Sequence, residues 1–256
     1  MSKRERKKWP GSESALRRDT GKIVTDDGEL SFVAYGPDRA GNKPPILLYM
    51  DSVGIRPGLE EFSRRLARAG HWVILPDLYY RTGPIEIDAR YPAKSSAEIQ
   101  RHTSALTEGA ILSDTQRILA AMTEFGGRAI GRWITMGFCM GGRFAVWAAG
   151  QYSGQVAACV SVIGTSLVRE TGESPVDRLF SENIPSLFVF AGADEYIKPA
   201  SVAAIEERVR RAKNGSQVKV CPSVGHGFIF PDRHNYDEAE SEHAWEFIEE
   251  FLRGVH

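Results

Sequence analysis

The stretch MGFCMGG, residues 136–142, places a cysteine among glycines, directly after the apolar run RWITM and directly before the helix-like run RFAVWAA. Glycines let a chain turn sharply from a strand into a helix. A residue at the apex of such a turn is exposed at the strand end, and the helix N-terminus behind it favours negative charge. The stretch therefore predicts a strand, a nucleophile elbow at Cys139 and a helix. A buried cysteine in a phosphate-binding turn is the alternative, although the spacing is not GxGxxG.

The size and composition of the chain favour one large α/β domain. The chain has 256 residues, of which 42% are hydrophobic and 25% are charged, so it is long enough to bury a sizeable core. A net charge of −1 provides no field to hold nucleic acid or an acidic membrane. We therefore expect a small molecule as the partner, with no nucleic acid and no membrane, and either a monomer or a homodimer.

The cysteines and the N-terminal segment indicate in which cellular compartment the protein is expected. The three cysteines form no CxxC spacing, which favours neither a disulfide framework nor a zinc site and fits a reducing cytoplasm. Cys159 and Cys221 fall in apolar runs and are predicted to be core residues. Residues 1–20 are basic and are expected to form a mobile extension before a single domain over 21–256. They lack the apolar region of a secretory signal, and no later run approaches about 18 apolar residues.

Short apolar runs alternate with helix-period stretches along the chain, which predicts a mostly parallel sheet with helices on both faces. The segment 78–108 is rich in turn residues and is expected to be an elaborated crossover near a binding cleft. The predicted strands are 30–35, 45–50, 71–76, 132–137, 156–164, 186–192 and 218–221, and the predicted helices are 57–69, 109–124, 141–149, 199–213 and 238–253.

Two later strand ends carry the residues that a catalytic cysteine needs. Asp194 follows the run SLFVFAG, and His226 lies between two glycines after the run VKVC. In a parallel sheet these loops share the edge that carries Cys139, where ligands bind. The order nucleophile, acid, base is that of α/β-hydrolases. The sequence therefore predicts a triad of Cys139, Asp194 and His226.

Other acids and histidines are weaker candidates for these roles. Asp77 also ends a strand but precedes the cysteine in the chain, so it is the second choice for the acid. Glu195 is expected to be solvated, His243 lies on the polar face of a helix, and His234 is too far from its strand end. The chain has no HExxH spacing, and we expect no metal site.

Four motifs, GFCMGG, PDLYYR, AGADEYI and GHGF, together resemble the dienelactone hydrolase family of α/β-hydrolases over about residues 28–254. The resemblance implies an α/β-hydrolase fold and a cysteine nucleophile, here Cys139, served by His226 and Asp194. It also implies hydrolysis of cyclic or enol-type esters without a cofactor. Dienelactones are the substrate class that the family prefers.

The chain departs from the family pattern at two positions. Asp51 stands where the family has a glutamate that touches and helps to ionise the thiol, so Asp51 is the candidate for that role. Phe230 stands where the family's dienelactone-hydrolysing member has an arginine for the substrate carboxylate. Neutral esters are therefore expected to compete well, unless Arg81, Arg101 or Arg233 reaches the substrate.

The expected reaction is attack of the Cys139 thiolate on an ester or lactone carbonyl. The backbone N–H groups of Met140 and Ser52 are the candidates for an oxyanion hole. A general carboxylesterase or thioesterase remains an alternative function. A protein that binds a small ligand on the same fold without turning it over is a further alternative.

Overall fold

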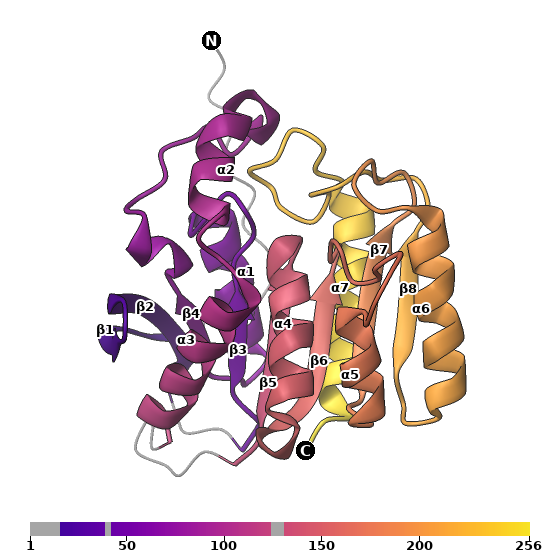
Figure 1. The fold of residues 1–256 in the computed structure, drawn as a ribbon, viewed down its shortest axis with the longest axis horizontal. Helices are drawn as coiled ribbons and strands as arrows, with labels where there is room; N and C mark the ends of the chain where they lie inside the picture. The colour runs from indigo at the N-terminus through magenta and orange to yellow at the C-terminus, as the bar shows by residue number, and fades with distance from the viewer. Residues whose placement is uncertain (1–15, 39–41, 124–130) are drawn as a thin grey trace.

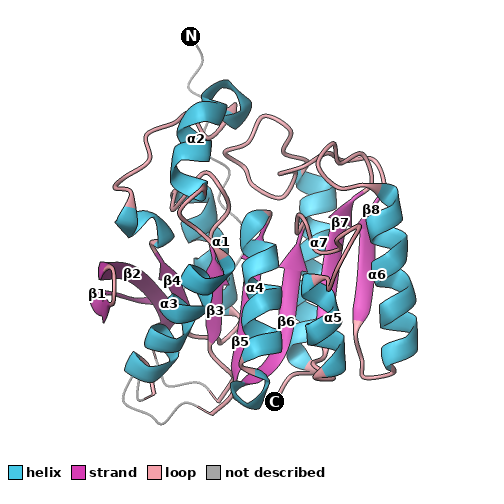
Figure 2. Cartoon of the chain, viewed as in Figure 1, coloured by secondary structure: helices cyan, strands magenta, loops and turns pink. Residues whose placement is uncertain are grey.

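The computed structural model describes residues 16–38, 42–123 and 131–256. These residues form an eight-stranded sheet in the order β1-β2-β4-β3-β5-β6-β7-β8, with helices packed on both faces (Figures 1 and 2). The strands are β1 (Leu16–Thr25), β2 (Gly28–Pro37), β3 (Ile46–Tyr49), β4 (Val73–Pro76), β5 (Trp133–Phe138), β6 (Val156–Val162), β7 (Ser186–Ala191) and β8 (Gln217–Cys221).

The predicted mostly parallel sheet is confirmed, because β4, β3, β5, β6, β7 and β8 run parallel. Among the described strands, β1 pairs antiparallel with β2, and β2 with β4. In Figure 1, α3, α4 and α5 cover the near face and α1 and α7 the far face, while α6 lies beside β8. The helices are α1 (Pro57–Arg68), α2 (Ser96–Thr103), α3 (Glu108–Ala121), α4 (Met140–Gln151), α5 (Pro175–Ser181), α6 (Pro199–Ala212) and α7 (Glu238–Arg253), with short 3₁₀ turns at Leu78–Arg81, Pro92–Ser95 and Ser153–Gln155.

The N-terminal strand corrects the expected extension over 1–20. Residues 16–20 belong to β1, which pairs with β2 from Leu16 opposite Pro37 to Thr25 opposite Gly28. Half of the residues of β1 are exposed, and Ile23 and Thr25 are its buried ones. A charged edge strand has little apolar periodicity, so its sequence does not resemble a strand. The rest of the expected extension, residues 1–15, lies outside the described residues.

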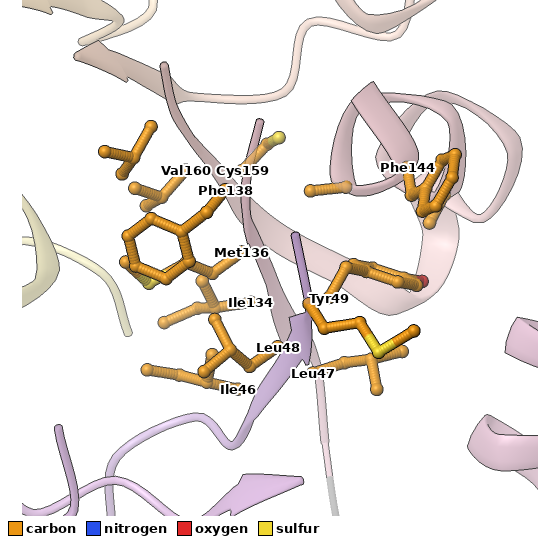
Figure 3. Close-up of a cluster of buried hydrophobic side chains, with 14 of the residues drawn as sticks. Ile46, Leu47, Leu48, Tyr49, Ile134, Met136, Phe138, Phe144, Cys159 and Val160 are labelled. Carbon is orange, nitrogen blue, oxygen red and sulfur yellow. The ribbon is translucent and has the colours of Figure 1, made fainter. Parts of the chain in front are cut away.

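The core lies around the central strands, whose residues are all buried in β3, β5, β6 and β7. Such continuous apolar runs are typical of parallel strands covered on both faces. Figure 3 shows Tyr49 of β3 on the side of the sheet where Phe144 of α4 packs, and the two rings meet edge to face at 6.4 Å. Cys159 is fully buried in this core, and Cys221 is buried at the end of β8.

The register of the central strands brings their carboxyl ends to one edge of the sheet. Tyr49 lies beside Gly137, and Phe138 beside Val162. The crossover 78–108 continues from this edge: its helix α2 lies at the top of the molecule in Figure 1, above α1. Tyr79 in the crossover donates from its hydroxyl to the carbonyl of Ser52 at 3.0 Å. The crossover therefore contacts the loop that follows β3.

Candidate active site

Cys139 lies at the turn between β5 and α4, as the sequence predicts. Its backbone φ is +55°, a left-handed conformation that costs a non-glycine residue about 1–3 kcal/mol. A Cβ on Gly137 would lie 2.1 Å from the carbonyl oxygen of Gly141, and a Cβ on Gly141 would lie 2.4 Å from that of Met50. The two glycines therefore allow the turn and bring the start of α4 against the end of β3.

The structure brings His226 and Asp194 together beside Cys139. His226 Nδ1 lies 2.8 Å from Asp194 Oδ2, and the two side chains are only 6% and 1% exposed. The second carboxylate oxygen of Asp194 accepts from the backbone N–H of Tyr196 at 2.9 Å, and the ring of Tyr196 packs edge-on against the imidazole. Neighbouring loops carry these residues because β7 and β8 are adjacent, with Ala191 beside Cys221.

The charge state of His226 depends on this arrangement. Burial by itself would lower its pKa, but the charge of Cys139 and hydrogen bonds to Asp194 and to the Cys139 side chain raise the pKa to about 10. These interactions favour the protonated imidazole. At neutral pH, His226 is therefore positioned as an imidazolium that can stabilise a neighbouring thiolate.

The weaker candidates for the acid and the base lie elsewhere. Asp77 caps the turn at Leu78–Arg81 by accepting from the backbone N–H of Tyr79 at 3.0 Å. Glu195 and His243 are exposed. His234 Nδ1 lies 2.8 Å from the carbonyl oxygen of Arg90 in the crossover.

The two oxyanion-hole candidates are on neighbouring loops. Met140 is the first residue of α4, so its backbone N–H has no acceptor within the helix. Ser52 lies in a turn after β3, where the N–H of Gly54 donates to the carbonyl of Asp51 at 3.1 Å. Because α4 begins against the end of β3, these two segments adjoin the same edge of the sheet.

Asp51, the candidate for ionising the thiol, is bound to an arginine that the sequence analysis did not identify. Arg56 donates to both carboxylate oxygens of Asp51, at 2.7 and 2.9 Å, and both side chains are 6% exposed. Arg56 also donates to Asp232 at 3.3 Å, and Asp232 accepts from the N–H of Gly58. This ion cluster ties the loop after β3 to the loop after His226. A charged residue in an otherwise apolar loop, five positions after Asp51, is the signal that could have identified Arg56.

The four substrate-binding candidates occupy different places. Arg81 is bound by both carboxylate oxygens of Asp114 and by Asp27. Arg101 is half exposed and pairs with Glu98, and Phe230 is 1% exposed. Phe230 packs against Phe138 with ring centroids 4.7 Å apart, so it belongs to the core and does not line the site.

Arg233 is the candidate that lies near the predicted triad. Its side chain is 9% exposed, and its Nη1 lies 4.0 Å from Asp51 Oδ2. Burial lowers the pKa of Arg233, and the charges of Asp51 and Cys139 partly oppose that effect. Its Nε has no hydrogen-bond partner within the described residues. Arg233 is therefore available to an anionic group on a ligand.

Arg143 is a second arginine near Cys139, and the sequence analysis did not consider it. It lies one helical turn after Cys139 on α4, and its guanidinium packs over the rings of Trp147 and Phe144. The spacing of four residues from the apex of the elbow is the signal that could have identified it.

The described ranges contain no group of three or more histidine, cysteine, aspartate or glutamate side chains that could hold a metal ion. In the same ranges, the structure has no helix with the length and apolar character needed to cross a bilayer.

The sheet order, the elbow and the residues at the strand ends define a hydrolase of the α/β-hydrolase fold. The chain matches the dienelactone hydrolase family over residues 30–256 and belongs to that family. This confirms the resemblance noted in the sequence.

Sequence and structure comparisons with individual proteins support this family assignment. The chain is 29% identical over 216 residues, 83% of this chain and 77% of the relative, to a Salmonella typhi protein with the provisional name carboxymethylenebutenolidase. It is 25% identical to the carboxymethylenebutenolidase of Rhodococcus opacus, with 83% of each chain covered. A crystal structure of a provisionally named dienelactone hydrolase from Klebsiella pneumoniae superposes with a TM-score of 0.80 at 23% identity, covering 94% of this chain and 99% of that one. At this level of sequence identity, the similarity to the Klebsiella structure supports the fold alone.

Proposed function

We propose that the chain is a cysteine-dependent hydrolase of esters or lactones, with Cys139 as nucleophile, His226 as base and acid, and Asp194 as the group that orients His226. The observation that carries the proposal is the 2.8 Å contact between Asp194 Oδ2 and His226 Nδ1, with the imidazole beside Cys139. A buried carboxylate at 2.8 Å from Nδ1 holds the imidazole with Nε2 toward the thiol.

In the first half of the reaction, the Cys139 sulfur attacks the carbonyl carbon of the substrate. The negative charge on the carbonyl oxygen is stabilised by the N–H groups of Met140 and Ser52, each contributing about 3 kcal/mol. The tetrahedral intermediate collapses, the bond to the leaving oxygen breaks, and His226 transfers its proton to that oxygen. The product of this half is a thioester on Cys139.

In the second half, neutral His226 takes a proton from a water molecule, whose oxygen attacks the thioester carbonyl. Collapse of the second intermediate returns the electron pair to sulfur and releases the carboxylic acid. The thiolate and the imidazolium are then restored. Asp194 stays ionised throughout and stabilises each imidazolium that forms.

Membership of the dienelactone hydrolase family supports a lactone or enol ester as the substrate. The carboxymethylenebutenolidase name of the Rhodococcus relative supports the same choice. A thiolate also reacts more readily with esters that have stabilised leaving groups than with amides. A steady-state comparison of dienelactones, aryl esters and thioesters by kcat/KM tests the substrate class.

The role of Cys139 is tested by a burst experiment with an activated aryl ester. A stoichiometric burst of phenol followed by slower turnover is expected, because a thioester accumulates. The thioester should be detected by mass spectrometry on Cys139, and Cys159→Ala serves as the matched control because Cys159 is fully buried in β6. Stoichiometric binding without product release would instead indicate a ligand-binding protein, and acylation elsewhere would contradict the assignment.

A further inference from the structure

Helix α4 presents one exposed stripe that begins at Cys139. Within the helix, Arg143 and Trp147 are partly exposed and Gln151 is exposed, whereas the other residues from Met140 to Gly150 are buried. Positions four apart lie on one face of a helix. Arg143, Trp147 and Gln151 therefore form a continuous line along α4 away from the elbow.

The far part of this stripe, Trp147 and Gln151, lines an open groove. The groove lies between α3, α4 and the segment that leads into and begins α5, and these three helices cover the near face of the sheet in Figure 1. Its apolar part includes Leu112 and Trp147, and its charged part includes Glu108 and Arg169. Glu108 and Arg169 approach to 3.6 Å and link α3 to the segment before α5.

Arg143 connects this groove to Cys139. Its guanidinium is 5.1 Å from the ring centroid of Trp147, which lines the groove, and its charge interacts with those of Cys139, Arg169 and Glu108. Burial lowers the pKa of Arg143, as expected for a cation that lacks a strong ion pair. Within the described residues Arg143 forms no ion pair, and its buried Nε and the buried Nε1 of Trp147 have no hydrogen-bond partner.

A partly buried arginine without a carboxylate partner is costly for a protein to keep. Arg81, by contrast, is paired with Asp114 and Asp27. Trp147 lines the groove, and the Arg143 guanidinium packs over its ring one helical turn nearer Cys139, so one extended ligand could contact both side chains. The chemistry of that ligand is an anion, because a guanidinium binds carboxylate oxygens through two parallel hydrogen bonds.

We propose that the groove along α4, together with Arg143 one turn nearer Cys139, is a second subsite for the substrate, in which Arg143 binds an anionic group and Trp147 packs against the chain that carries it. This inference rests on the proposed hydrolase function and specifies its substrate class. Arg143 is one helical turn from Cys139, about 6 Å along the axis. Among the esters and lactones proposed above, this favours a substrate whose anionic group is several bonds from the scissile carbonyl.

Three p-nitrophenyl esters test the proposal in steady-state kinetics: the half-ester of adipic acid, its neutral primary-amide counterpart and the short acetate. In Arg143→Gln, kcat/KM for the anionic half-ester should fall at least about tenfold, mainly through KM, since a hydrogen bond to a charged group is lost. The neutral and short esters should change less than about twofold. Arg143→Lys should restore part of the loss.

Two further variants make the test specific. Trp147→Ala should weaken turnover of both long esters and leave the acetate unchanged. Arg210→Gln, which removes an exposed arginine from α6, should change none of the three. An equal loss on all three esters in Arg143→Gln would overturn the proposal, because it would mean that Arg143 acts on the Cys139 thiolate. An unchanged preference for the anion in Arg143→Gln would overturn it as well.

A binding measurement separates this inference from the proposed function. Calorimetry on Cys139→Ala, with the p-nitroanilide of adipic acid and its neutral amide counterpart, requires no turnover. Tighter binding of the anionic ligand that disappears when Arg143→Gln is added supports the subsite, even if the wild type hydrolyses no ester and the proposed function fails. Equal binding of the two ligands refutes the subsite while leaving the hydrolase intact.

Discussion

Replacing Arg56 by methionine should destabilise the folded protein strongly, because Asp51 would lose its main partner. The two side chains are 6% exposed, and the guanidinium donates to both carboxylate oxygens within 2.9 Å. Breaking a buried ion pair by removing one partner costs about 3–5 kcal/mol, since the other charge stays buried. Arg233, already 4.0 Å from Asp51, can offset part of this loss, so we expect about 3 kcal/mol.

Urea denaturation followed by tryptophan fluorescence measures this effect as a shift in midpoint at constant m value. Arg210→Met is the matched control, because Arg210 is 71% exposed in its pair with Glu207 and such pairs contribute less than about 1 kcal/mol. The double variant with Asp51→Leu should recover most of the stability, because it leaves no unpaired charge at position 51. A loss below about 1 kcal/mol for Arg56→Met would refute the reasoning.

The remaining predictions concern the proposed catalytic groups and the elbow. Cys139→Ala should lower kcat/KM on an aryl ester by at least about a thousandfold, whereas Cys159→Ala should stay near wild type; near-normal turnover by Cys139→Ala would refute the assignment. The pKa of His226 is raised from 6.5 to about 10, so its stabilising contribution is complete below pH 6.5 and is lost as the pH rises through 10. The difference in unfolding free energy between wild type and His226→Gln should therefore shrink over that range in urea titrations, and a difference that grows would contradict the sign. Gly141→Ala should destabilise the protein by about 1–3 kcal/mol, because its Cβ would lie 2.4 Å from a backbone oxygen at the end of β3; an unchanged denaturation midpoint would count against the tight elbow.

Local patterns were sufficient to predict the parallel sheet and the place of the elbow. Short continuous apolar runs, such as those of β5, β6 and β7, are typical of strands that are buried on both faces of a parallel sheet. Gly137 has a local steric cause, because a Cβ there would lie 2.1 Å from the carbonyl oxygen of Gly141. The positions of Asp194 and His226 at strand ends could be predicted for a related reason, since parallel strands point their carboxyl ends the same way.

The pairing of charged side chains could not be predicted, because it joins residues far apart in the chain. Arg81 was one of several candidates for binding substrate, and the fold places Asp114 and Asp27 against it. Asp51 was a candidate for ionising the thiol; Arg56 binds both of its oxygens and also donates to Asp232, which lies far along the chain. The strength of an ion pair depends on separation and burial, and neither quantity is encoded in local sequence.

The sequence by itself therefore determined the fold class, the family and the positions of the candidate triad, because each depends on periodicity or on short motifs. Only the tertiary structure decided which charges are neutralised and which are left without a partner near Cys139. It paired Asp51 with Arg56, buried Phe230 in the core and left Arg143 without an ion pair, within the described residues, beside Trp147. Packing distances between separate elements set these outcomes, and those distances exist only once the sheet and its helices have assembled.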